Sequence, residues 1–226
     1  MLKIDNLYVR YNENLVLNDL KVEFKTGKIH GIFGLNGSGK TTFFNAIYGF
    51  INHKALISLN GRIISKMDIG YLESTNFFYK YITGKEYLDV FNAKGTKMFD
   101  EKRLTEILKL PLTEFVENYS EGMKKKIALL GIIKLGRDVL LLDEPFNGLD
   151  IESVYLVKAL IQQLKNKGIT VLISSHIVEI LYDLCDDFFV LENGNFLPFQ
   201  DKEQFKIHCN NIYQKTEQLI SATFLP

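Results

Sequence analysis

The sequence predicts an α/β fold with a parallel sheet, an antiparallel β subdomain at the N-terminal end and an inserted helical lobe. Residues 139–143 and 169–174 are apolar runs, which are typical of parallel strands covered on both faces. Residues 34–42 form a Gly-rich segment between an apolar run and a stretch with helical spacing. Between residues 75 and 134 the periodicity becomes helical, which indicates the inserted lobe.

The first part of the chain, up to residue 74, combines short strands with one helix. Alternation of apolar and polar residues predicts the first two strands, and helical spacing over residues 41–50 predicts the helix. The strands are expected at 2–9, 20–24, 28–34, 57–61 and 67–72.

Pro111 interrupts the helical lobe, which otherwise has helical stretches at 83–91, 100–110 and 120–135. After the lobe, a helix beginning at residue 151 is expected to stop before Gly168. The Asn193-Gly194 pair predicts a tight turn between two strands. A last helix after Asp201 is expected, with no assigned role.

Composition and charge narrow the choice of partners. The 226 residues include 27 basic and 27 acidic ones, whereas proteins that bind nucleic acid usually carry a basic excess, so we expect no nucleic-acid partner. Charge alone predicts that Lys124, Lys125 and Lys126 lie on a solvated helix face. Cys185 and Cys209 form no CxxC motif, which fits a reducing, cytosolic setting.

The sequence predicts no membrane span of its own. No stretch approaches about 18 consecutive apolar residues, and Asp5 and Asn6 interrupt the segment where a signal peptide needs an apolar run. If the protein works at a membrane, a partner must supply the spanning part.

The Gly-rich segment fits the pattern G-x-x-x-x-G-K-[ST], a phosphate-binding P-loop. Glycines let the backbone turn its N–H groups toward phosphate, and the start of the following helix adds partial positive charge. Lys40 would reach the β- and γ-phosphates of ATP, and the Thr41 hydroxyl would bind Mg²⁺. The expected nucleotide-binding residues are Gly34, Leu35, Asn36, Gly37, Ser38, Gly39, Lys40, Thr41 and Thr42.

Two adjacent carboxylates end the apolar strand at 139–143. Asp143 would hold Mg²⁺ directly or through water, and Glu144 would act as general base on the attacking water. Together with an upstream P-loop, this pair predicts a nucleotide-hydrolysing site.

These ordered motifs resemble those of the ATP-binding cassette (ABC) ATPases over nearly the whole chain, from Met1 to about Phe199. The resemblance implies one domain with a P-loop NTPase core. It also implies that Tyr11, ahead of Val16-Leu17, stacks on adenine, although by itself Tyr11 is an ordinary tyrosine. The implied division is a nucleotide-binding core at 1–74 and 135–200, a helical signature lobe at 75–134 and a C-terminal tail at 201–226.

The family signature LSGGQ has a variant here. Ser120 and Gly122 match, whereas Tyr119, Glu121 and Met123 depart from it. The resulting S-x-G-M-K looks like a form common among exporters. The resemblance implies that Ser120, Gly122 and Met123 cap the γ-phosphate of ATP held by another subunit. The alternative is that Ser120 simply caps a helix.

Two further positions are similar to family motifs. Asp150 follows Gly148-Leu149 as in the D-loop at the dimer interface, and it would also cap the next helix. His176 ends an apolar strand as the switch histidine does, which implies contact with the γ-phosphate beside Glu144. The other histidines are expected to be structural: His30, His53 and His208.

The Q-loop glutamine of the family is missing. By spacing Ser74 takes its position, and the neighbouring Glu73 is the candidate for the Mg²⁺ contact. Phe77, Phe78 and Tyr79 follow, and either line a groove for a helix of a membrane partner or belong to the core.

The resemblance implies an ATP-hydrolysing motor of an ABC transporter that binds ATP and Mg²⁺. It would pair head to tail with a second copy or a homologous subunit and drive a separate membrane permease, as an exporter. It would lie in the cytoplasm, peripheral on the inner face of the cell membrane. The alternatives are a soluble ABC ATPase and a nucleotide-sensing regulator.

Overall fold

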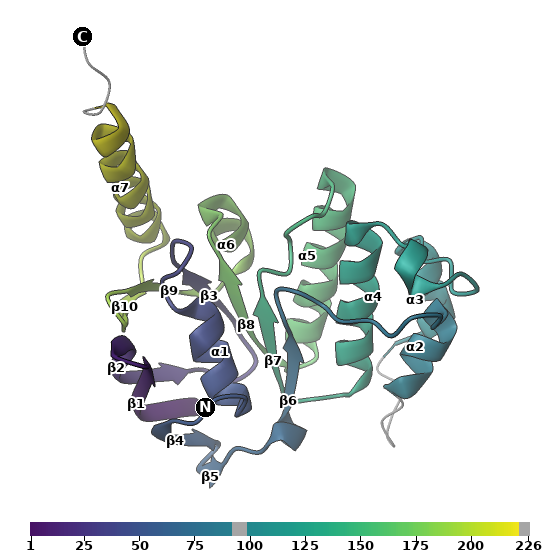
Figure 1. The fold of residues 1–226 in the computed structure, drawn as a ribbon, viewed down its shortest axis with the longest axis horizontal. Helices are drawn as coiled ribbons and strands as arrows, with labels where there is room; N and C mark the ends of the chain where they lie inside the picture. The colour runs from purple at the N-terminus through teal and green to yellow at the C-terminus, as the bar shows by residue number, and fades with distance from the viewer. Residues whose placement is uncertain (92–98, 222–226) are drawn as a thin grey trace.

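The computed structural model describes residues 1–91 and 99–221, and residues 216–221 as backbone only. Residues 92–98 of the predicted lobe and 222–226 of the predicted tail lie outside the described residues. Figure 1 shows a central sheet with helices on its faces and an antiparallel sheet beside it, so the predicted fold class is confirmed.

The central sheet has the strand order β10-β9-β3-β8-β7-β6, and its edge pair β9–β10 is antiparallel while the other pairs are parallel. Neighbouring residues face opposite sides, so Leu140 and Leu142 pack in one core and Leu141 in the other. Coverage of both faces explains the uninterrupted apolar runs. The strands are β3 (Ile29–Phe33), β6 (Ile69–Leu72), β7 (Val139–Asp143), β8 (Thr170–Ser175), β9 (Asp187–Glu192) and β10 (Asn195–Phe199).

The second sheet is antiparallel, in the order β2-β1-β4-β5. Strand β2 begins earlier than expected. Asp19, with a left-handed backbone (φ 48°), lies where its pairing with β1 shifts register between Leu17 and Leu20. Helix α1 (Lys40–Tyr48) shares a core with both sheets through Phe43 and Phe44. The strands are β1 (Leu2–Tyr11), β2 (Asn14–Phe24), β4 (Lys54–Leu59) and β5 (Arg62–Ile63), with a 3₁₀ turn at Lys66–Asp68 before β6.

Helices α2 (Gly84–Val90), α3 (Glu101–Ile107) and α4 (Glu121–Lys134) lie together on the side of the molecule away from α7 (Figure 1). They have their own core, which includes Tyr119 of the segment that follows a 3₁₀ turn at Val116–Asn118. Of the three consecutive aromatic residues at 77–79, one has a core role and two remain available for a partner. Phe78 packs on the core, whereas Phe77 and Tyr79 are 77% and 72% exposed.

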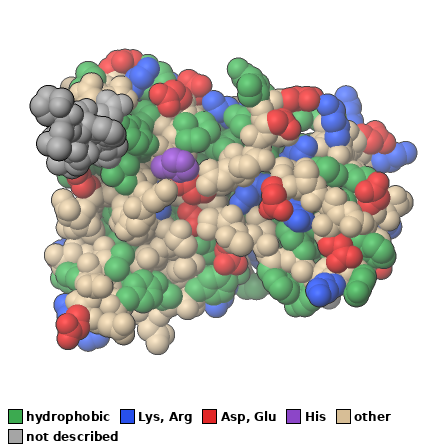
Figure 2. Space-filling view, turned by 45° about the horizontal axis from the view of Figure 1, so that its top comes forward, with side chains coloured by type: hydrophobic (Ala, Val, Ile, Leu, Met, Phe, Trp, Pro, Cys, Tyr) green, Lys and Arg blue, Asp and Glu red, His purple; other side chains and the backbone are tan. Residues whose placement is uncertain are grey.

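Helices α5 (Ile151–Asn166), α6 (Val178–Leu184) and α7 (Lys202–Ser221) complete the described structure. Helix α5 stops before Gly168, and positive φ angles at Asn193 and Gly194 close the predicted β9–β10 turn. In the described part of the chain, no helix combines the length and apolar character that crossing a bilayer requires. Acidic and basic side chains are interspersed on the face that Figure 2 shows.

Candidate functional site

The loop between β3 and α1 has the backbone that phosphate binding requires. Gly37 and Gly39 have φ angles of 81° and 104°, a region that other residues rarely adopt. A Cβ atom on Gly39 would also lie 3.0 Å from the Val16 side chain. Within the described residues no side chain caps the N-terminus of α1, so its first N–H groups are available to an anion.

Lys40 and Thr41, the first two residues of α1, connect the loop to the end of β7. The buried Lys40 amine donates to the carbonyl oxygen of Gly34 at 2.6 Å and lies 3.4 Å from a carboxylate oxygen of Glu144. The Thr41 hydroxyl donates to Asp143 at 2.6 Å. Segments about a hundred residues apart in sequence thus meet at one point.

Ser174 holds the two carboxylates of this site in place. It pairs with Asp143 in the parallel register of β7 and β8, and its hydroxyl donates to the fully buried Asp143 carboxylate. The same hydroxyl accepts the backbone N–H of Glu144 at 3.0 Å. Glu144 has a φ angle of 48°, so the backbone turns tightly there, and this hydrogen bond holds the turn. Sequence reasoning assigned no role to Ser174, and only its place beside Asp143 reveals one.

Glu144 and His176 form the pair that the sequence suggested for water activation. The Nδ1 atom of His176 lies 3.1 Å from each carboxylate oxygen of Glu144. An ionised carboxylate can only accept hydrogen bonds, so the Nδ1–H tautomer of His176 is the one that can donate to Glu144. His176 follows β8 directly and Glu144 follows β7 directly, which brings the two side chains to the same edge of the sheet.

Glu144, Lys40 and Thr41 line a pocket of about 390 Å³. Tyr11 is 46% exposed at its wall, consistent with the expected stacking position. Asn147, which was not among the predicted site residues, also lines the pocket. The lining residues are Tyr11, Val16, Asn36, Gly37, Gly39, Lys40, Thr41, Thr42, Ser74, Glu144 and Asn147.

The loop after β6 is held by Lys125 of α4. Its amine donates to the carbonyl oxygen of Ser74 at 2.7 Å and lies 3.4 Å from that of Glu73. Ser74 lines the pocket, whereas the Glu73 side chain is exposed to solvent. Ser74, which takes the position of the missing Q-loop glutamine, is therefore held through its backbone carbonyl group.

The prediction that the lysine run lies on a solvated face is wrong. Lys125 and Lys126 are only 6% and 7% exposed, and the Lys124 side chain is one quarter exposed. Burial lowers the pKa of Lys125, against the attraction of Asp143 and Glu144. The run is buried because α4 packs between the central sheet and the helical side.

The signature residues lie apart from the pocket, at the start of α4. Ser120 accepts the N–H of Met123 at 3.2 Å, and a Cβ atom on Gly122 would lie 3.3 Å from the Gly148 carbonyl oxygen. Asp150 accepts the N–H of Ser153 at 2.7 Å and so caps α5. This hydrogen bond lowers the pKa of Asp150. The structure thus joins the signature to the D-loop within one chain.

The site fits a nucleotide phosphate group and a magnesium ion. The Ser38 hydroxyl is buried and has no hydrogen-bond partner among the described residues, so a phosphate oxygen could satisfy it. Thr41 and Asp143 offer two hard oxygen ligands, and Mg²⁺ usually takes one or two protein ligands with substrate phosphates. Among the described residues, no three His, Cys, Asp or Glu side chains gather in a metal-binding group, so Glu73 belongs to no such preformed cluster.

A Gly-rich loop at a helix start, a strand-end Asp-Glu pair and a histidine on the next strand define a P-loop nucleotide-binding domain of the ABC class. The "ABC transporter" family model matches residues 17–147, more than half of the chain. The chain belongs to the family of ABC transporter ATP-binding proteins.

Relatives and solved structures agree with this assignment. The ABC-type transporter ATP-binding protein EcsA of Bacillus subtilis is 32% identical, over 86% of this chain and 84% of its own. The linearmycin resistance ATP-binding protein LnrL of the same organism is 27% identical, over 100% and 78%. A structure described as the ATP binding subunit of an ABC transporter matches with a TM-score of 0.78 and 28% identity, over 87% of this chain and 88% of that one.

A further structure shares the fold. It is described as a dimeric, post-hydrolysis state of an ATP-binding cassette bound to ADP and phosphate, and it matches with a TM-score of 0.75 at 19% identity. The match covers 87% of this chain and 96% of that one.

Proposed function

We propose that this chain is the ATP-hydrolysing motor subunit of an ABC transporter. The observation that carries the proposal is that Lys40, Thr41 and Glu144 line one pocket, while Asp143 contacts Thr41 and His176 contacts Glu144. Glu144 would accept a proton from the attacking water, and His176 would keep its carboxylate oriented. Lys40 would leave its contact with Glu144 to bind the phosphates of ATP.

Magnesium would be held by Thr41 and Asp143, and when bound it would neutralise charge that develops on the phosphates. Ser174 keeps Asp143 turned toward Thr41 through its own hydrogen bond. A metal role for Glu73 would require its exposed carboxylate to turn toward Asp143, and it stays a prediction.

The location of the signature residues supports a role for a second subunit. Ser120, Gly122 and Met123 lie at the N-terminus of α4, beside the D-loop and outside the pocket lining of their own chain. They would contribute to catalysis by capping nucleotide held by a second copy or a homologous subunit. A dimeric relative of the same fold supports this arrangement.

A separate membrane permease would be the other partner. Exposed aromatic residues gather before α2 and beside its start, including Phe77, Tyr79 and Tyr81, and could receive a helix of that permease. This would place the chain in the cytoplasm, on the inner face of the membrane. The S-x-G-M-K signature and the missing glutamine favour an exporter, and one relative is named for linearmycin resistance.

The proposal is tested by Mg²⁺-dependent ATP hydrolysis over a range of protein concentrations, with Glu144→Gln measured beside the wild type. We expect turnover per subunit to rise with concentration, and Glu144→Gln to lose turnover while forming an ATP-dependent dimer in light scattering. ATP binding with neither turnover nor dimerisation would contradict a self-sufficient homodimer, and the chain would then need a different ATPase partner or be a nucleotide-sensing regulator.

A further inference from the structure

Helix α7 packs on the central sheet through residues spaced four apart, Phe205, Cys209 and Tyr213. Phe205 is fully buried and stacks on Phe188 of β9, with ring centroids 4.7 Å apart. Cys209 is also fully buried. Tyr213 comes one turn later on the same face, so the packing of this face determines its position.

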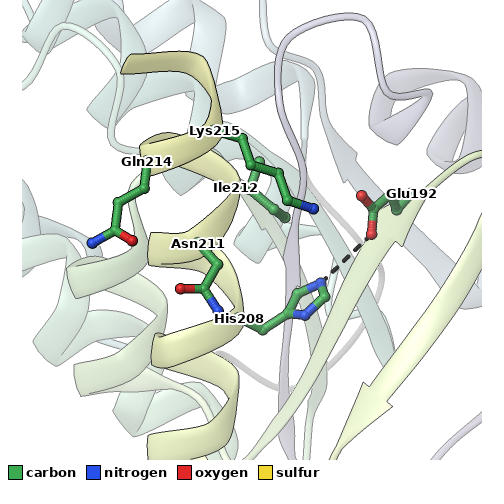
Figure 3. A pocket seen from close by; sticks show the side chains of 6 residues that line it. All are labelled: Glu192, His208, Asn211, Ile212, Gln214 and Lys215. Atoms are coloured by element: carbon green, nitrogen blue, oxygen red, sulfur yellow. Dashed lines mark ion pairs between the residues drawn. The ribbon is translucent and has the colours of Figure 1, made fainter. Parts of the chain in front are cut away.

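A second contact lies on the same stretch of α7. A pocket of about 380 Å³ lies between α7 and the end of β9. Figure 3 shows His208 facing Glu192 there. The Nε2 atom of His208 lies 3.5 Å from a carboxylate oxygen of Glu192.

Tyr213 contacts two parts of the candidate site at once. Its ring packs edge-on against Phe33, the last residue of β3 and the one before the P-loop, with centroids 5.8 Å apart. Its hydroxyl donates to the backbone carbonyl oxygen of His176. The same loop is held on its other side by the Ser175 hydroxyl, which accepts the N–H of Ile177 at 3.0 Å.

These contacts act on the histidine that faces Glu144. A fixed carbonyl limits rotation of the His176 backbone, and so keeps Nδ1 within 3.1 Å of the Glu144 carboxylate. Burial raises the pKa of Tyr213, and the charge of Glu144 acts in the same direction. The phenol therefore stays protonated and donates at neutral pH.

We propose that Tyr213 is a positioning residue for hydrolysis: its hydroxyl holds the His176 loop, and through it α7 determines how well His176 orients Glu144. The proposal rests on the proposed ATPase function. It gives the C-terminal helix a role in the rate of turnover.

The test compares Tyr213→Phe with Tyr182→Phe in the full chain. Each variant removes one tyrosine hydroxyl that hydrogen-bonds to or from α7, because the Tyr182 hydroxyl on α6 donates to Glu203 of α7 and not to the His176 carbonyl. We expect Tyr213→Phe to lower kcat about 3- to 10-fold, the effect of one hydrogen bond, with KM for ATP and the melting temperature nearly unchanged. Tyr182→Phe should retain wild-type kcat.

Equal kcat for Tyr213→Phe and wild type would overturn the proposal, as would an equal loss in Tyr182→Phe. Absence of turnover in the wild type would instead reject the proposed function. In that case NMR of the His176 imidazole decides: its resonances should shift in Tyr213→Phe and stay in place in Tyr182→Phe. Unchanged resonances in both variants would overturn the positioning role.

Discussion

His176 lies with its Nδ1 atom 3.1 Å from both carboxylate oxygens of Glu144. A contact that is equally close to both oxygens fixes the plane of the carboxylate. The rest of the carboxylate surface faces the pocket. Because each residue directly follows a strand, the two neighbouring parallel strands bring them to the same edge of the sheet.

Replacing His176 with alanine should lower kcat about 100-fold and leave ATP affinity within a few-fold of wild type, since orientation of the general base is lost while the P-loop is unchanged. Steady-state kinetics and equilibrium nucleotide binding measure the two effects. His53→Ala is the control, because His53 lies outside the pocket lining and should behave as wild type. Equal losses in the two variants would contradict the assignment.

Ser174→Ala should destabilise the protein by about 1–3 kcal/mol and raise the Mg²⁺ concentration needed for half-maximal turnover. The Glu144 amide loses its buried acceptor, and Asp143 loses a donor that orients it. Thr170→Val is the matched control, because Thr170 accepts a backbone N–H from Gly27 at the other end of β8. Thr170→Val should lower stability without changing the Mg²⁺ dependence of turnover. An equal change in Mg²⁺ dependence in both variants would show that Ser174 has no specific effect on the metal site.

Lys125→Met should speed amide hydrogen exchange in the loop around Ser74 while keeping thermal stability close to wild type. The hydrogen bond that fixes the loop is lost, but so is the cost of burying a charge. Hydrogen exchange followed by mass spectrometry measures the loop directly, with Lys124→Met as the control on the neighbouring, less buried lysine. Unchanged exchange in Lys125→Met would show that the loop is fixed by other contacts.

Mixing two inactive variants should restore activity if the site is shared between subunits. Lys40→Ala impairs the P-loop and Gly122→Asp impairs the signature. Neither homodimer therefore has a complete site. A mixed dimer retains one site with an intact P-loop and an intact signature. ATPase assays of the mixture should exceed the sum of the separate proteins, and simple additivity would contradict head-to-tail pairing.

Asp150→Asn should lower stability at neutral pH, with a difference that disappears in acid. The N–H of Ser153 lowers the pKa of Asp150 in the folded state. A lowered pKa gives stability that is fully present above the unfolded value of about 3.9 and is lost as pH falls through the folded value. Melting temperatures at pH 7, 5, 4 and 3 should therefore converge with wild type.

Asp183→Asn is the control for this titration, since Asp183 pairs with Lys158 on the surface at 3.0 Å. It should change the melting temperature little at any of these pH values. A difference between Asp150→Asn and wild type that is as large at pH 3 as at pH 7 would mean that the charge of Asp150 is not its cause.

The sequence alone was sufficient for the P-loop, the strand-end carboxylates and the alternation of strands and helices. These features depend on contiguous residues. Glycine permits the backbone of the loop at Gly37 and Gly39, and an apolar strand places Asp143 and Glu144 at its end. The fold class follows from the same local patterns, because each element forms from its own periodicity.

Tertiary structure alone decided the roles of Ser174, Lys125 and Tyr213. Ser174 meets Asp143 through the register of two strands, and Lys125 is buried because α4 packs on both sides. Tyr213 reaches His176 across 37 residues of sequence. Local sequence cannot specify such contacts, because the residue type does not show whether its hydroxyl or amine lies on a solvated face or on a packed one. Only the packing of distant segments determines which of these groups lose contact with water and must bind each other.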